Sequence, residues 1–313
     1  MEVKKKGVAS YLQEYGAFLA LIFLVIGISI VSPEFRTGNN FLSLLRQSSI
    51  NGLIAFGMTG VILTGGIDLS VGSVLALSTA LCAGMISSGL SAGLSIILAL
   101  AIGTLLGVIS GLLITKGRLQ PFIATLITMT IYRGLTMIYT DGKPISNLGD
   151  HFILKFAGKG NLFGIPVPVL ILLCIFLLFA FLLTQTTFGR KVYAIGSNAQ
   201  CAQLAGVNIN KTKIILYGIS GLMASISGII LLSRLNSAQP TLGSGYELDA
   251  IASVALGGTS MNGGRGKIQG TLIGVLIIAV LNNGLNILGV SSYYQDVVKG
   301  LVILLAVLAD RKR

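Results

Sequence analysis

Long apolar segments alternate with short polar intervals along most of the chain. Segments of roughly 17–25 apolar residues have the length that an α-helix needs to cross the hydrocarbon core of a bilayer. We predict membrane spans, with one shorter element among them, at Gly16–Val31, Ile50–Thr64, Leu69–Ser87, Ala92–Thr115, Pro121–Thr140, Ile165–Leu183, Ile214–Ser233, Glu247–Gly257, Ile268–Leu288 and Tyr294–Ala309. The pattern predicts an all-α polytopic membrane protein with about ten transmembrane helices, some of them broken, in a single domain over residues 1–313.

Three polar intervals between these segments carry structural information. Asn39–Gln47 predicts a short amphipathic helix at the outer interface, and Asp141–Gly164, which contains glycine, proline and asparagine, predicts an extracytoplasmic loop. The longest polar interval is Thr184–Lys213, which we expect on the cytoplasmic side. Within it, Asn198 is a suitable N-cap for a short helix and Gly206 a suitable C′ residue after that helix.

The distribution of charge supports this orientation. The sequence is 53% apolar and 10% charged, and its formal net charge is +12. Basic residues gather in short clusters between apolar segments, at Lys4–Lys6, Lys116 and Arg118, Arg190 and Lys191, Lys211 and Lys213, Arg265 and Lys267, and Arg311–Arg313. Basic intervals between spans belong on the cytoplasmic side, and an even number of spans places both termini there. The clusters therefore indicate membrane orientation rather than nucleic-acid binding.

Two glycine-rich breaks interrupt the apolar pattern in the same way. In VILTGGIDLSVGSVLAL (Val61–Leu77) and VALGGTSMNGGRGKIQGTLIGVL (Val254–Leu276), a glycine pair and a few polar residues separate two apolar helices. The similarity is typical of an internal repeat of the kind found in transporters. The short element Glu247–Gly257 crosses the membrane only if the glycine-rich segment after it contributes.

Acidic residues at the starts of two predicted helices have two interpretations. Gly65 and Gly66 end one helix, and Asp68 caps the next by accepting an N–H group from Ser70 or Val71. Two further acids lie in the first turn of the short element, at Glu247 and Asp249, where the helix macrodipole favours them. Either these carboxylates are caps at the membrane boundary, or they are functional acids near the transport pathway.

Small and amide-bearing residues mark two predicted spans. Small residues form a ridge on Ala92–Thr115, at Gly103, Gly107 and Gly111, which predicts close packing against another helix. Within Ile268–Leu288, three amides lie within one turn, at Asn282, Asn283 and Asn286. These amides either join helices by hydrogen bonds or bind the hydroxyl groups of a polar solute.

Several functional classes lack their sequence signatures. The glycine-rich segment Gly257–Lys267 lacks the Gly-Lys-Ser/Thr ending of a nucleotide-binding P-loop. The sequence has no Ser/His/Asp arrangement and no metal-ligand spacing, so we predict no catalytic residue and no metal site. Because no chain of acids runs through the spans, the sequence also disfavours a proton-driven carrier.

Four long motifs resemble the permease subunits of bacterial ABC monosaccharide importers. They stand in the same order as in that family: GMTGVILTGGIDLSVGSVLAL (Gly57–Leu77), KGRLQPFIATL (Lys116–Leu126), AQPTLGSGYELDAIASVALGGTSMNGGRGKIQGTLIG (Ala238–Gly274) and LNNGLNILGVSSYYQDVVKGLVILLAVL (Leu281–Leu308). The resemblance extends over about Asn39–Asp310 and is closest to the members that import ribose.

This resemblance implies a set of partners in the bacterial inner membrane. Two permease copies, most simply a homodimer, would enclose one pathway surrounded by membrane lipid. A separate cytoplasmic ATPase with two fused nucleotide-binding halves would use ATP and Mg, so this chain would bind no cofactor itself. An extracytoplasmic sugar-binding protein would deliver the substrate, and no nucleic acid is involved.

The resemblance also implies a coupling segment within Thr184–Lys213. The family's coupling helix, which sits in a groove of the ATPase, corresponds to Asn198–Asn210, with the contacts assigned to Asn198, Ala199, Ala202, Leu204, Ala205, Gly206 and Asn208. Ala199 and Gln203 stand where close relatives are expected to carry an acid and a base. Shape and Gly206 are therefore expected to matter more than charge at this contact.

The expected mechanism is alternating access driven by the ATPase. We expect gates at the broken helices, around Gly65–Gly72 and Gly257–Gly266, where the backbone bends most easily. The gate and pathway candidates are Gly65, Gly66, Asp68, Ser70, Asn282, Asn283 and Asn286. The alternatives are a secondary carrier driven by an ion gradient and a channel or scaffold independent of ATP. Within the importer family, galactose, xylose, allose or a ribose-like signalling molecule remain alternative substrates.

Overall fold

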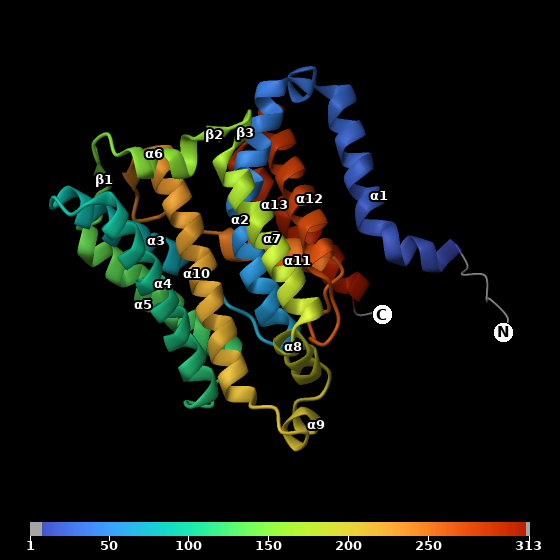
Figure 1. Cartoon of the computed structure of the whole chain (residues 1–313). Helices are drawn as coiled ribbons and strands as arrows, with labels where there is room; N and C mark the ends of the chain where they lie inside the picture. Colours follow the sequence, from blue (N-terminus) through green and yellow to red (C-terminus); the bar gives the residue numbers. More distant parts are fainter. Residues whose placement is uncertain (1–7, 311–313) are drawn as a thin grey trace.

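The computed structural model describes residues 8–310 and is built mainly of α-helices (Figure 1). The basic clusters Lys4–Lys6 and Arg311–Arg313 lie outside the described residues. The helices are α1 (Val8–Val31), the 3-10 helix η1 (Glu34–Arg36), α2 (Gly38–Leu63), α3 (Val71–Ser87), α4 (Ala92–Thr115), α5 (Pro121–Thr140), α6 (Phe152–Lys159), α7 (Val167–Gln185), α8 (Thr187–Ser197), α9 (Ala199–Leu204), α10 (Ile209–Leu235), α11 (Tyr246–Leu256), α12 (Ile268–Ile287) and α13 (Ser292–Asp310).

Two small antiparallel pairs of strands join loops at one end of the molecule. They comprise β1 (Ile145–Ser146) with β4 (Ser237–Ala238), and β2 (Asn161–Leu162) with β3 (Ile165–Pro166). The first pair attaches the segment after α5 to the segment after α10, which are distant in sequence. The sequence pattern did not predict these strands, because two residues are too few for a recognisable alternation.

The start of α2 differs from the sequence prediction. We expected a separate interfacial helix at Asn39–Gln47 before a span at Ile50–Thr64, but one continuous helix of 26 residues runs from Gly38 to Leu63. The polar pair Ser48 and Ser49 does not interrupt it, because both hydroxyls donate to the carbonyl of Leu45, at 3.0 and 2.7 Å. The prediction of a break there was wrong, because serine satisfies its own hydroxyl inside a helix in this way.

Two intervals predicted to be loops contain additional helices. The helix α6 lies within Asp141–Gly164 and is attached to α10, since the N–H group of Gly158 donates to Ser233 Oγ at 3.0 Å. The helix α8 precedes Asn198. Its N-cap is Thr186, whose side chain accepts from the Gly189 N–H group at 3.2 Å. The bounds predicted for α4 and α5 are confirmed.

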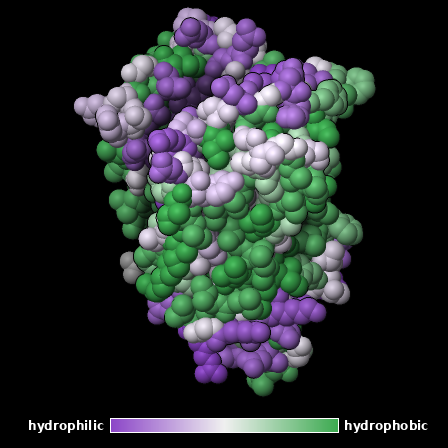
Figure 2. All heavy atoms as spheres, turned by 90° about the vertical axis from the view of Figure 1, so that its left-hand side faces the viewer, coloured by the Kyte–Doolittle hydropathy of each residue, from purple (hydrophilic) through white to green (hydrophobic). Residues whose placement is uncertain are grey.

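The apolar surface is consistent with a membrane protein of several spans. Five helices in the described part of the chain are long and apolar enough to cross a bilayer, namely α4, α5, α7, α10 and α12, and Gly16–Val31 and α3 are shorter apolar helices. Figure 2 shows a broad apolar band between polar ends on the face formed by the left-hand side of Figure 1. The count of ten spans stays a prediction.

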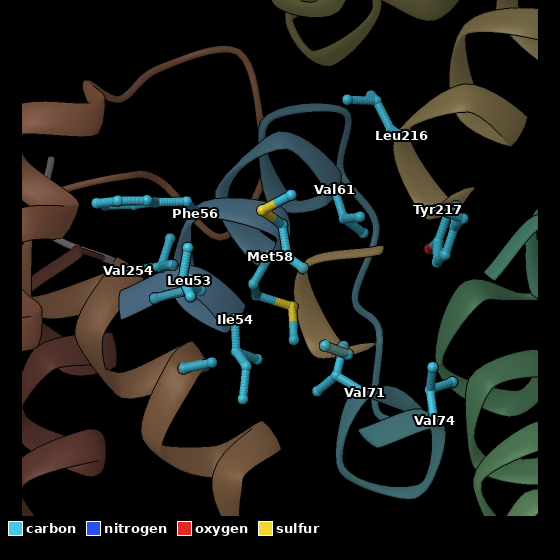
Figure 3. Packing of buried hydrophobic residues seen from close by; sticks show 14 of the residues in the cluster. Leu53, Ile54, Phe56, Met58, Val61, Val71, Val74, Leu216, Tyr217 and Val254 are labelled. Carbon is cyan, nitrogen blue, oxygen red and sulfur yellow. The ribbon is translucent and has the colours of Figure 1, made fainter. Parts of the chain in front are cut away.

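The helices α2 and α10 form the centre of the packing. Figure 3 shows Leu53 of α2 beside Val254 of α11, and Val61 of α2 on the side that faces Tyr217 of α10. The glycine ridge of α4 faces α10: a Cβ atom at Gly107 would collide with the Tyr217 carbonyl, and one at Gly111 would lie 2.9 Å from Ile214 Cα. A Cβ atom at Gly103 would likewise collide with the Ser225 side chain. Two backbones approach this closely only where side chains are absent.

Candidate functional site

The two glycine-rich breaks meet each other at the end of the molecule that carries α8 and α9. The N–H group of Gly264, between α11 and α12, donates to the carbonyl of Leu63 at 2.9 Å. A Cβ atom at Gly263 would lie 2.8 Å from the Gly65 nitrogen. The segments Leu63–Gly66 and Gly257–Lys267, which are about 200 residues apart in sequence, are therefore in direct backbone contact.

The end of α8 packs into the same place. A Cβ atom at Gly196 would collide with the Leu63 carbonyl and with the Gly264 nitrogen, and one at Gly264 would lie 2.8 Å from Ser197 N. Gly264 has a positive φ of 73°, which a residue with a side chain adopts only with strain. We call the contact among Leu63, Gly65, Gly196, Gly263 and Gly264 the glycine junction.

Tyr193 of α8 adds a side-chain link next to the glycine junction. Its hydroxyl donates to the carbonyl of Gly266 at 2.9 Å. Burial raises the pKa of the Tyr193 phenol above its ordinary value, so the group remains a protonated donor at neutral pH. The helix α8 is therefore attached to the α11–α12 connection through both backbone and side chain.

The short helix predicted after Asn198 is present as α9, directly after α8. Asn198 Oδ1 accepts from the Cys201 N–H group at 2.9 Å, which confirms the predicted N-cap. Gly206 follows the helix with a φ of 80°, as expected of a C′ residue. The next cap is Asn208, whose side chain accepts from Lys211 N at 2.9 Å and begins α10.

Most of the coupling candidates are exposed in this chain. Ala202 is buried, whereas Leu204 is 88% exposed. The remaining exposed candidates are Asn198, Ala199, Ala205, Gly206 and Asn208. Beside α9 lies a hollow of about 440 Å³ lined by Gln203, Gly206, Val207, Asn208, Ile209 and Asn210. Figure 1 shows α9 as the outermost element at the lower end of the molecule, so it is a small knob with an exposed apolar tip.

Asp68 joins the first glycine-rich break to α10. Its carboxylate is buried and accepts from the Ser70 N–H group at 3.1 Å, from Ser70 Oγ at 2.6 Å and from Ser220 Oγ of α10 at 2.7 Å. The hydroxyl of Tyr217 donates to the Ile67 carbonyl at 3.1 Å. The predicted acceptance from Ser70 is confirmed, and the bond to Ser220 shows that Asp68 also holds two helices together.

Asp249 lies in a polar pocket of about 450 Å³. Asn51 Nδ2 and Asn282 Nδ2 each lie 3.5 Å from Asp249 Oδ2, and Lys299 Nζ lies 3.5 Å from Asp249 Oδ1. We call this the Asp249 pocket; α2, α11, α12, α13 and the turn between the last two helices line it, with Gln47, Asn51, Tyr246, Asp249, Asn282, Asn286, Gly289, Val290, Ser291, Ser292, Gln295 and Lys299.

The three asparagines of α12 divide between the two roles considered for them. Asn282 and Asn286 line the Asp249 pocket. Asn283 instead exchanges hydrogen bonds with Asn40 of α2, at 2.8 and 3.0 Å. One amide therefore joins helices, while two face a polar cavity.

Several residues of these contacts were not singled out from the sequence. Asn51 and Ser220 are polar residues within buried apolar helices, which is a usable signal. Tyr193 had no such signal, because its partner Gly266 is distant in sequence. The spacing of Lys299 predicts its pairing with Asp296 but not its contact with Asp249. Lys299 also lies 3.7 Å from Asp296, one turn away on α13, so local pairing alone would have explained it.

Comparisons with known proteins agree with these features. The chain matches the family described as the permease component of the branched-chain amino acid transport system over residues 40–307. The ribose import permease protein RbsC of Bacillus subtilis is 60% identical over 302 residues, which cover 96% of this chain and 94% of that protein. No solved structure matches the chain.

Two further relatives carry the same name. RbsC of Haemophilus influenzae is 52% identical over 305 residues, 97% of this chain and 94% of that protein. RbsC of Escherichia coli is 50% identical over 307 residues, 97% of this chain and 95% of that protein. With its apolar helices and these relatives, the chain is a multi-pass protein of the inner membrane and a transport subunit rather than an enzyme. It belongs to the family of transport-system permease components that includes the ribose import permeases.

Proposed function

We propose that this chain is the membrane-spanning permease subunit of an ATP-driven ABC importer that carries ribose into the cytoplasm. The observation that carries the proposal is identity of 60%, 52% and 50% to ribose import permeases of three bacteria, over nearly the whole length of each chain. Identity at this level over nearly the whole length supports a shared function as well as a shared fold.

The importer would contain three further kinds of component. Two copies of this chain would form a homodimer, and an extracytoplasmic binding protein would deliver ribose. A cytoplasmic ATPase with two nucleotide-binding halves would use ATP and Mg. The exposed knob α9 supports an ATPase contact, because its exposed Leu204 offers an apolar side chain to a partner.

The orientation follows from the positions of the basic residues. We infer ten passes, formed by α1, α2, α3, α4, α5, α7, α10, the short α11 with its glycine-rich extension, α12 and α13. Exposed basic residues lie close to α9 in sequence, at Arg190, Lys191 and Lys211. Two more lie at the end of the second glycine-rich break, at Arg265 and Lys267. Such residues belong on the cytoplasmic side, together with both termini.

The glycine junction supports a route from ATP to the gates. Closure of the ATPase would displace α9, and α8 would move with it because the two helices adjoin at Asn198. Since α8 contacts Leu63 and Gly264 directly, its movement would shift the C-terminal end of α2 and the segment that precedes α12 together. ATP drives this change only if it binds one arrangement more tightly than the other.

Reconstituted transport tests the proposed function. The permease, ATPase and binding protein would be placed in proteoliposomes, and uptake of labelled ribose measured with each component omitted in turn. We expect uptake only when all three components and ATP are present. Uptake by the permease alone that is insensitive to ATP and abolished by an ionophore would contradict the proposal in favour of a secondary carrier.

A further inference from the structure

The Asp249 pocket is unusual for the interior of a membrane protein because its polar groups are poorly satisfied. Asp249 is only 5% exposed, yet its three nearest polar neighbours, Asn51, Asn282 and Lys299, all lie at 3.5 Å. Hydrogen bonds to a carboxylate are normally near 2.7–2.9 Å. The three groups therefore surround the Asp249 carboxylate at distances longer than those of ordinary hydrogen bonds to a carboxylate.

Asn282 provides an independent sign of a missing partner. Its side chain is 9% exposed, and its Oδ1 atom accepts no hydrogen bond from any residue within 8–310. A buried amide oxygen without a donor is unfavourable and rare in native structures. The same residue lines the Asp249 pocket, so the unpaired oxygen belongs to a side chain that borders the cavity around the loosely held carboxylate.

The chemistry of the lining selects a neutral ligand with several hydroxyl groups. Asn51 and Lys299 supply donors, Asp249 supplies acceptors, and Asn282 supplies both. Lys299 lies 3.5 Å from Asp249 and 3.7 Å from the mostly exposed Asp296, so the lining has no net positive charge, which disfavours an anion as the ligand. A hydroxyl group both donates and accepts, so it can bridge groups that lie too far apart to bond directly.

The size of the cavity suits the same class. A volume of about 450 Å³ lies within the range of about 300–1,000 Å³ that is usual for small-molecule sites. Tyr246 adds an aromatic side chain to the wall, which can cover the apolar face of a sugar ring. Two exposed serines complete the lining, Ser291 of the α12–α13 turn and Ser292 at the start of α13.

We propose that each copy of this chain binds a monosaccharide in the Asp249 pocket, with Asp249, Asn51, Asn282 and Lys299 holding its hydroxyl groups. The identification of the sugar as ribose rests on the proposed function. The proposal places sugar binding in the permease itself, before the ATPase or the binding protein takes part.

Direct binding tests this proposal. The purified full-length permease in lipid nanodiscs would be titrated with isotope-labelled D-ribose by equilibrium dialysis, without ATPase or binding protein. We expect saturable binding by the unchanged chain. Asn282→Leu and Asn51→Leu, which keep the side-chain size but remove the amides, should each weaken binding about tenfold or more, as the loss of one or two hydrogen bonds implies.

Matched controls separate binding from folding. Asn40→Leu removes an amide from the same helix as Asn51, but Asn40 pairs with Asn283 outside the pocket, so binding should be retained. Asn286→Ala changes an exposed pocket residue and should weaken binding without affecting the fold. Ribose 5-phosphate should compete poorly, because Asp249 and Asp296 already share Lys299 and no positive charge is left to pair with the phosphate.

The outcomes distinguish this proposal from the importer proposal. Absence of saturable binding, or equal binding by the Asn282→Leu, Asn51→Leu and Asn40→Leu variants, would overturn the pocket even if the complete importer transports ribose. Binding that depends on Asn51 and Asn282, in a reconstituted system that transports no ribose, would support the pocket and contradict the importer.

Discussion

A single carboxylate holds the first glycine-rich break in place. Asp68 is 1% exposed and accepts three hydrogen bonds, two from Ser70 and one from Ser220. A buried charge is tolerated when its hydrogen-bonding capacity is met, and removal of one donor leaves it under-satisfied. The position of the break against α10 therefore depends on the hydrogen bonds of Asp68 with Ser70 and Ser220.

We predict that Ser220→Ala destabilises the protein by about 1–3 kcal/mol, because it leaves one oxygen of Asp68 without its donor. The free energy of unfolding in mixed detergent micelles provides the measurement. Ser88→Ala serves as the control: Ser88 is exposed and bonds only to the nearby Met85 carbonyl, so its loss should cost under about 0.5 kcal/mol. Equal effects of the two substitutions would contradict the role assigned to Ser220.

The helix α8 does more than connect α7 to α9, because its C-terminal end takes part in the glycine junction. Its end touches both glycine-rich breaks, at Leu63 and Gly264. A side chain at Gly264 would have to push against Ser197 in addition to adopting a strained φ of 73°. A close fit of this kind transmits displacement, since packed interiors resist compression.

We predict that Gly264→Ala impairs coupling more than a comparable change elsewhere. Gly142→Ala is the matched control, because Gly142 has a similar φ of 67° but no atom lies within 4 Å of its Cβ position. Both variants carry the left-handed strain of about 1–2 kcal/mol, and only Gly264→Ala adds overpacking of about 1–3 kcal/mol. The ratio of ribose transported to ATP hydrolysed should fall in Gly264→Ala alone; an unchanged ratio would argue against the junction as a link.

The orientation of the whole molecule in the membrane can be measured through one native thiol, that of Cys201. The cysteines are buried at Cys82 and exposed at Cys174 and Cys201. Cys201 lies on the knob α9, whereas Cys174 lies within the apolar helix α7. A polar reagent that cannot cross the membrane should therefore reach Cys201 on α9 and should not reach the buried Cys82.

We predict that a membrane-impermeant maleimide labels Cys201 in inside-out vesicles and not in right-side-out vesicles. The Cys174→Ser variant removes the second exposed thiol, and Cys201→Ser in the same background should abolish labelling. Bound ATPase should protect Cys201 if α9 is the coupling helix. Labelling in right-side-out vesicles would place α9 on the outer side and overturn the proposed topology.

Local signals in the sequence were sufficient for most helices. The bounds of α4 and α5, the cap at Asn198 and the acceptance by Asp68 from Ser70 depend on residues within a few positions of each other, so pattern and local hydrogen bonding reveal them. Asp68 is not the cap of α3, because Ser70 holds the N-cap position. The same reasoning failed at the start of α2, where the buried Ser48 and Ser49 resemble a polar interval. It also failed for α8, because a helix on the polar side of a membrane protein has no long apolar run.

The membrane class, the apolar helices, the capped helix α9 and the resemblance to a family can all be read from the order of residues along the chain. The packing of the helices is needed to show that Leu63, Gly196 and Gly264 share one contact, and that Asn282 faces Asp249 while Asn283 faces Asn40. Spans and caps arise from interactions over one or two turns, which neighbouring residues specify. Contacts between distant segments depend on how the helices pack around α2 and α10, and neighbouring residues along the chain do not record that arrangement.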